Sequence, residues 1–146
     1  MNIQTKFHGE QEINKDDIIH FPSGIPGFLD EKEFYIFPLD GTDLFVLQSV
    51  KTTKVAFIVT DPFALFPQYG FDLPDETIEK LEIQTEKDVV TFAILTLREP
   101  FKETTANLQA PLVINQTKKL GKQVILNQTP YQTKHKIMTP QEQGER

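Results

Sequence analysis

Carboxylate side chains are concentrated in residues 72–88, where seven acids and two lysines give a net charge of −5. No two of these acids form a recognisable pair whose surroundings would drive their pKa values apart, as acid–base catalysis requires. Two interpretations stay open: a solvated helix face, or a docking surface for a basic partner. The candidate partner-binding carboxylates are Asp75, Glu76, Glu79, Glu82, Glu86 and Asp88.

Residue types that catalyse reactions or bind metals are sparse elsewhere. The sequence has no cysteine, which excludes disulfides, thiolate catalysis and zinc sites built on cysteine. Its three histidines, His8, His20 and His135, are scattered along the chain. Neither Ser23 nor Ser49 lies in the pattern of a nucleophile elbow. We therefore expect no enzymatic activity, no bound metal and no cofactor.

A loop rich in glycine and proline, FPSGIPGFLD, occupies residues 21–30. It lacks the lysine of a phosphate-binding Walker loop, and its prolines remove backbone amides that would hold a phosphate. We interpret it as a rigid turn with Pro26 and Gly27 at the central positions of a type II turn. We expect Phe28 and Leu29, which follow, to enter the core.

The distribution of charge bears on the class of partner. Residues 1–101 carry 8 basic and 18 acidic side chains, whereas residues 102–136 carry six lysines and one glutamate. An acidic body repels nucleic-acid phosphates and attracts a basic protein, so we expect no direct nucleic-acid ligand. No apolar run approaches the roughly 20 residues of a membrane span, and the N-terminus lacks the apolar core of a signal peptide. These features favour a cytoplasmic protein with no membrane contact.

Short apolar runs between turn signals predict a mainly β domain. The expected strands are 2–7, 17–21, 33–39, 44–50, 54–60, 89–97, 110–115 and 123–127. Strands 44–50 and 54–60 are joined by a short connection, which predicts an antiparallel pair. Strands 54–60 and 89–97 are apolar on both alternating faces, so both faces should be covered.

Helical patterns are few. Residues 72–83 predict a helix, with Asp72 capping its first amides and Pro74 in its first turn. A second, shorter helical turn is expected after Pro26, over residues 28–33. Gly121 is expected to be the left-handed residue of a hairpin.

The fold class expected from these elements is mainly β: a small antiparallel β-barrel-like domain with one or two short helices. The sequence does not separate a barrel from a sandwich, but closure removes exposed strand edges and favours the barrel, with the helix over one opening. We expect a single domain over residues 1–131. Residues 132–146 are polar and are expected to form a flexible tail.

Four segments together resemble the FliW family of flagellar assembly factors, in the family's order. They are FPSGIPGFLDEKEFYIFPL, FVLQSV, AFIVTDPF and TTANLQAPLVIN, and the likeness extends over nearly all of residues 1–131. The loop contains a five-residue element of the family: Gly, then either Ile or Leu, then Pro-Gly-Phe. The family-motif residues, to which the resemblance assigns a structural role, are Gly24, Pro26, Gly27, Phe28, Asn107, Leu108 and Pro111.

The resemblance implies a non-enzymatic regulator with a small barrel-like fold and two protein partners. These are flagellin and CsrA, an RNA-binding translational regulator that represses flagellin synthesis. When flagellin is exported, the family member that was bound to it becomes free and would antagonise CsrA. This would couple flagellin synthesis to export. The alternative class is a small-ligand or flavin-binding β-barrel. A nucleic-acid-binding barrel would interleave basic and aromatic residues, whereas here the lysines follow most of the aromatics.

The resemblance also gives the candidate residues their expected roles. The acidic candidates would create a field hostile to RNA phosphates beside CsrA, within a Debye length of roughly 8–10 Å. The segment DPFALFPQYGF, residues 61–71, is rich in aromatic residues and has two interpretations. Its side chains either plug the barrel or form an apolar surface for the amphipathic helices of flagellin. The candidate contacts are Phe63, Leu65, Phe66 and Tyr69.

Overall fold

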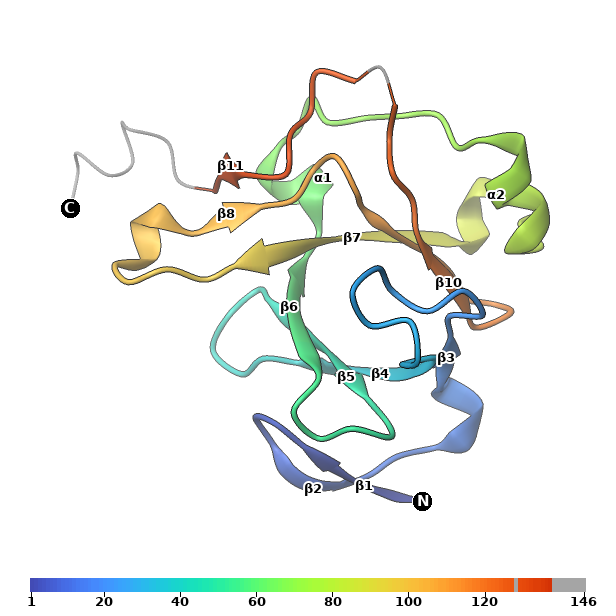
Figure 1. The fold of residues 1–146 in the computed structure, drawn as a ribbon, viewed down its shortest axis with the longest axis vertical. Helices are drawn as coiled ribbons and strands as arrows, with labels where there is room; N and C mark the ends of the chain where they lie inside the picture. Colours follow the sequence, from blue (N-terminus) through green and yellow to red (C-terminus); the bar gives the residue numbers. More distant parts are fainter. Residues whose placement is uncertain (128, 138–146) are drawn as a thin grey trace.

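The computed structural model describes residues 1–127 and 129–137, and within them seven short strands close into a barrel (Figure 1). In order around the ring these strands are β3 (Ile19–His20), β4 (Glu33–Pro38), β5 (Phe45–Ser49), β6 (Ala56–Thr60), β7 (Val89–Thr96), β9 (Leu112–Asn115) and β10 (Leu120–Gln123). Neighbours from β3 to β10 pair antiparallel. The expected mainly β, barrel-like fold with short helices is therefore confirmed.

The ring closes where β10 returns to β3. These two strands run parallel and share a single bridge, Leu120 opposite His20. The His20 N–H donates to the Lys119 carbonyl at 2.8 Å across this seam. Closure at this point gives both strands a partner on the side that an open sheet would leave exposed.

Alternate residues of each strand fill the barrel interior. Phe34, Leu47, Val59 and Leu112 point inward from four different strands and are completely buried. Their neighbours in β6 and β7, such as Ala93, point outward and are covered by a second cluster. The expectation that β6 and β7 are covered on both faces is confirmed.

The role expected for Gly121 is wrong, and its real role is to leave room for an aromatic ring. Gly121 lies within β10, and the left-handed residue of this hairpin is Lys119, with φ of 57°. A Cβ on Gly121 would lie 2.6 Å from the nearest ring carbon of Phe21, which is fully buried in the interior. A glycine is needed here because the ring occupies the space of its side chain.

The loop of residues 21–30 lies within the outline of the ring of strands in Figure 1. Its turn is as expected: the Phe28 N–H donates to the Ile25 carbonyl at 2.6 Å, and Gly27 has φ of +88°. The expectation for its apolar side chains is wrong, since Ile25 is 1% exposed while Phe28 and Leu29 are 41% and 62% exposed. Ile25 instead packs in the interior cluster of the barrel.

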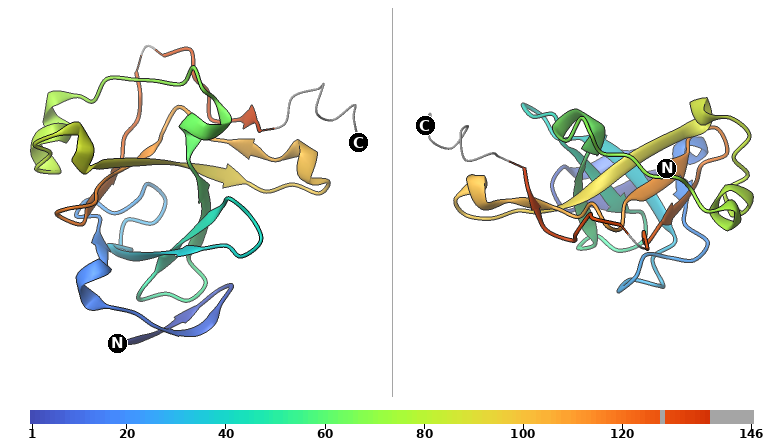
Figure 2. Two further views of the ribbon diagram at one scale, coloured as in Figure 1. Left: turned by 180° about the vertical axis from the view of Figure 1, so that it is seen from behind. Right: turned by 90° about the horizontal axis from the view of Figure 1, so that it is seen from above.

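Three further segments cover the outside of the barrel. A hairpin of β1 (Asn2–Thr5) and β2 (Gly9–Glu12) packs on β4. The helix α1 (Pro62–Leu65), with β8 (Thr105–Ala106) and β11 (His135–Lys136), covers β6 and β7. The helix α2 (Asp75–Lys80) packs near β9 and β10. Figure 2 shows both helices at the periphery.

Several expected element boundaries differ from the structure. Helix α2 is shorter than residues 72–83 and lies against the outer wall, not over an opening. Residues 28–33 form no helix: residues 29–30 are a turn and Glu33 already begins β4. Strand β10 ends before most of residues 123–127. Ordered structure continues past the expected boundary at 131, because β11 pairs with β8. Residue 128 and residues 138–146, most of the expected tail, lie outside the described residues.

Replacing Gly121 tests the packing at the seam. Gly121→Ala puts a methyl group where the Phe21 ring lies, so we expect a loss of about 1–3 kcal/mol in the free energy of unfolding, measured by denaturant titration. Gly70→Ala is the control, since a Cβ there meets no atom within 4 Å, and it should change stability little. Phe21→Leu in the Gly121→Ala background should recover part of the loss. A Gly121→Ala variant as stable as the parent would contradict this packing.

Candidate protein-interaction surface

Helix α2 begins without a side-chain cap. Its N-cap is Pro74, not Asp72 as expected, and no side chain accepts from its first amides. The Pro74 carbonyl instead accepts from the N–H groups of Thr77 and Ile78, at 3.0 and 3.1 Å. Because the helix is short and uncapped, its position depends on contacts with the barrel.

Asn115, at the end of β9, provides the main polar contact that holds α2 to the barrel. Its buried side-chain amide donates to the carbonyls of Leu81 and Glu82, at 2.8 and 3.2 Å. Its side-chain oxygen accepts from the backbone N–H groups of Thr117 and Lys118. One buried asparagine therefore connects the end of α2 to the turn between β9 and β10.

The acidic candidates lie on α2, at Glu82 shortly after it, and on the 3₁₀ turn η2 (Glu86–Asp88) that precedes β7. Five are exposed, and we call these five the acidic face: Asp75, Glu76, Glu79, Glu82 and Glu86. Glu76 forms an ion pair with Lys80 at 2.9 Å, and the hydrogen bond from Lys80 holds the Glu76 pKa below its usual value. Among the described residues, the other four make no ion pair.

Asp88 differs from the other acidic candidates because its carboxylate accepts hydrogen bonds from neighbouring segments of the protein. It accepts from the Thr117 hydroxyl at 2.8 Å, and this hydrogen bond lowers the Asp88 pKa. It also accepts from the Thr85 N–H and closes the start of η2. Its charge still adds to the local negative field, but the side chain has structural partners.

A groove of about 820 Å³ lies between the acidic face and the segment that joins α1 to α2. Its floor is the first half of β7, residues 89–92, and Phe45 adds an aromatic ring beside Phe92. Its lining also includes Phe63, Phe71 and Leu73 from residues 61–73, and Ile78, Ile83 and Glu86 from α2 and the residues after it. The groove is thus apolar inside and acidic at its margin.

The aromatic segment of residues 61–71 is divided between surface and core. Asp61 caps α1 by accepting from the Phe63 N–H at 2.9 Å, and this leaves Phe63 and Leu65 44% and 39% exposed. Tyr69 is buried, and its hydroxyl donates to the Leu108 carbonyl at 2.8 Å. Burial raises the Tyr69 pKa, and the neighbouring Tyr131 raises it further.

The expected roles of Phe66 and Tyr69 therefore need correction. Both pack in the cluster outside β6 and β7, and Phe66 is only partly exposed. Neither side chain plugs the barrel interior, which is filled by other residues. Because Tyr69 is in the core, the exposed apolar side chains of this segment are Phe63 and Leu65.

The family-motif residues occupy positions with evident structural roles. Gly24 has φ of +69°, and a Cβ there would lie 2.5 Å from the Leu29 carbonyl oxygen. The Asn107 side chain accepts from the backbone N–H groups of Gln109 and Ala110, and Leu108 is buried. The Pro111 carbonyl accepts from the Val124 N–H at 2.9 Å. Pro26 and Gly27 form the loop turn, and Phe28 packs edge-on against Phe57.

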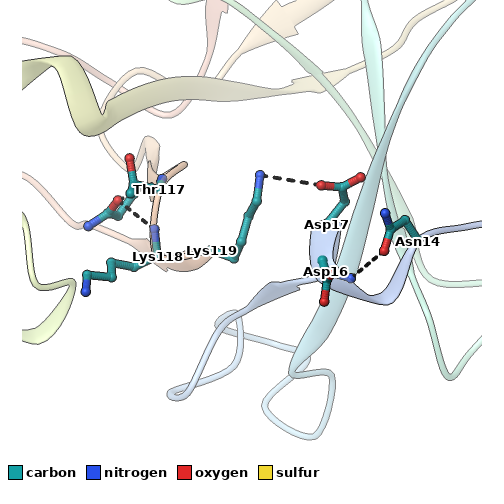
Figure 3. Close-up of polar contacts among 7 residues, drawn as sticks. Asn14, Asp16, Asp17, Thr117, Lys118 and Lys119 are labelled. Atoms are coloured by element: carbon teal, nitrogen blue, oxygen red, sulfur yellow. Dashed lines mark hydrogen bonds and ion pairs between the residues drawn. The ribbon is translucent and has the colours of Figure 1, made fainter.

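The turn between β9 and β10 carries lysines at the seam of the barrel (Figure 3). Lys119 approaches Asp17 at 3.9 Å, while Asn14 accepts from the Asp16 N–H at 2.9 Å. Asp17 and Lys119 also line a cavity of about 330 Å³ that reaches Ile36 in the interior.

Within residues 1–127 and 129–137, no group of three acidic or histidine side chains is arranged to hold a metal. No helix in this part of the chain is long and apolar enough to cross a membrane.

Sequence reasoning found the acidic face but missed the groove and the Asn115 contact. The acids could be found because they fall outside the apolar stripe of α2. The groove depends on Phe45, Phe71 and β7 meeting from distant parts of the sequence. The signal for Asn115 was a polar residue ending an apolar strand, which is a weak signal for a buried contact.

Comparisons with known proteins agree with one another. The sequence model of one protein family, described as FliW protein, matches residues 2–137. The chain is 53% identical over 137 residues to the flagellar assembly factor FliW of Geobacillus thermodenitrificans, covering 94% of this chain and 95% of that protein. It is 49% identical over 138 residues to that of Bacillus subtilis, covering 94% and 96%. A crystal structure of the flagellar assembly factor FliW superposes with a TM-score of 0.92 at 50% identity, covering 95% and 98%.

Removing the Asn115 side chain tests how α2 is held. Asn115→Ala leaves two carbonyls and two amides without this partner, so we expect a loss of about 2–3 kcal/mol in the free energy of unfolding. Amides of α2 should also exchange faster with solvent, as measured by hydrogen exchange. Asn127→Ala is the control, because Asn127 precedes the same two residues, Gln and Thr, but is exposed. Equal losses in both variants would contradict this role.

Proposed function

This chain belongs to the FliW family of flagellar assembly factors, and on that basis we propose that it is a non-catalytic regulator with two protein partners. It binds flagellin, and when free of flagellin it binds and antagonises CsrA in the cytoplasm. Flagellin synthesis is thereby matched to export. The observation that carries this proposal is an exposed acidic face beside an apolar groove.

The acidic face supports the binding of CsrA. A protein that grips RNA phosphates presents a basic surface, and such a surface is attracted by a cluster of carboxylates without lysine partners. In this face, Lys80 pairs only with Glu76 among the described residues, which leaves four carboxylates available. Once docked, these charges repel incoming RNA phosphates that pass within a Debye length.

The exposed apolar residues of α1 support the binding of flagellin. Phe63 and Leu65 are both exposed on α1, and the Phe63 ring packs against Tyr69 with centroids 5.5 Å apart. An amphipathic helix lays its apolar stripe on such a surface. Flagellin contact is therefore assigned to Phe63 and Leu65, with Tyr69 supporting them from the core.

The arrangement also supplies a simple cause for the exchange of partners. Phe63 and Glu86 line the same groove. A partner bound at one of these residues restricts access to the other, so each partner weakens the binding of the other by the same free energy. Overlap at the groove thus accounts for switching without a change in the barrel.

Charge reversal tests the assignment of CsrA. We expect lysine substitutions on the acidic face to weaken CsrA binding at least tenfold at about 0.1 M salt, with a smaller effect at high salt. The reversed residues are Asp75, Glu79, Glu82 and Glu86. The control reverses four exposed acids elsewhere on the chain: Glu12, Asp30, Asp40 and Asp43. Isothermal titration calorimetry gives both affinities, and an equal effect of the two sets would refute the assignment.

Polar substitutions on α1 test the assignment of flagellin. We expect Phe63→Ser with Leu65→Ser to weaken flagellin binding about tenfold or more, because the apolar contact is lost. The thermal midpoint should change little, since both side chains are partly exposed. The control is Leu97→Ser with Phe101→Ser, two residues of comparable exposure on another surface. Unchanged flagellin binding in the α1 variant would exclude this surface.

A further inference from the structure

The first half of β7 has a free backbone edge. The Gln116 N–H donates to the Asp88 carbonyl and the Asn107 N–H donates to the Ile94 carbonyl, so even-numbered residues turn toward β9 and β8. Backbone groups alternate along a strand, so Val89, Thr91 and Ala93 turn the other way, toward β6.

Strand β6 covers only part of that edge. Its last pair joins Thr60 to Ala93, and the chain then leaves the sheet because α1 begins at Pro62. The Val89 N–H donates to Glu86 within η2. Beyond the strand ladders, the described residues provide no hydrogen-bond partner for the N–H and C=O of Thr91 or the C=O of Val89, and the ladder with β6 ends at Ala93.

This free edge forms the floor of the apolar groove. Thr91 and Val89 both line it, and the stretch of four residues that is not paired with β6, residues 89–92, is roughly 13 Å long. An unpaired edge of this kind is a template for another strand. The groove that residues 89–92 help to line has a volume of about 820 Å³, which leaves room for side chains of an added strand.

The charges of the groove specify what it accepts. Its charged lining residues are Asp61, Asp72 and Glu86, and none of its lining residues is basic. Its other walls are mostly aromatic and aliphatic. An occupant complementary to both features has apolar side chains facing the groove and lysine or arginine facing its acidic margin.

We propose that the free edge of β7 binds an extended segment of a partner protein as an added strand, with alternating apolar and basic side chains. Main-chain hydrogen bonds to Thr91 and Val89 hold the segment, and the groove and its carboxylates select its side chains. This goes beyond the proposed function, because it concerns the conformation of the bound segment and not the identity of the protein that supplies it.

The probe for the test is a capped synthetic peptide of about eight residues in which valine and lysine alternate. Peptide binding should slow hydrogen exchange of the Thr91 amide at least tenfold, as measured by NMR. The Phe92 amide, which faces β9, is the internal control and should not change. An unchanged Thr91 amide in the bound state, or no binding at millimolar peptide, would overturn the proposal.

Two further comparisons separate strand addition from other modes of docking. N-methylation of the valines and N-methylation of the lysines remove donors on opposite sides of the peptide, so one should abolish binding and the other should not. Equal binding of both would overturn the proposal. Replacing the lysines with glutamates should weaken binding at least tenfold at low salt. Equal binding of the glutamate peptide would refute the charge argument.

Protein variants locate the binding. Asp61→Asn, Asp72→Asn and Glu86→Gln together should weaken binding of the lysine peptide about tenfold at low salt and much less at high salt. Asparagine at 61 keeps the cap of α1, so the fold should be retained. Unaltered affinity for the lysine peptide in this triple variant would place binding elsewhere and overturn the proposal.

Discussion

The rest of the structure depends on the closure of a very small barrel by one parallel bridge. Strand β10 reaches β3 through Leu120 and His20, and few other hydrogen bonds hold that seam. What secures it is packing, because the Phe21 ring fills the space that a side chain on Gly121 would need. Close-packed protein interiors tolerate little change in side-chain volume, so a change in the packing of the interior also disrupts the seam.

The proposed partner surface follows from the same small barrel. Strands β6, β7 and β9 are apolar on both faces, so their outer faces must be covered by segments that leave the sheet. One of them begins where β6 ends at Thr60 and turns into α1. Because the chain leaves the sheet there, α1 covers part of β7, and the first half of β7 has no partner on the side of β6. The groove and the covering layer therefore have a common origin.

Sequence predicted the parts that depend on local pattern. The long apolar strands β4 to β7 and the acids of α2 could be placed from periodicity alone. Gly121 could not, because a glycine serves either a left-handed turn or a close approach, and Phe21, which decides between them, is far away in sequence. Ile25 and Phe28 are similarly apolar, and only the folded loop determines which one is buried. Asn115 likewise acquires its role from α2, through contacts between distant segments.

The central claim is that one preformed surface, made of α1, the acidic face and the free edge of β7, meets the partners while the barrel stays unchanged. Hydrogen exchange of the whole chain, alone and in complex with CsrA, tests it most directly. The account predicts slower exchange in residues 61–92 and no change at the seam amide of His20. Protection confined to the β1–β2 hairpin and β4, with residues 61–92 unaffected, would contradict it.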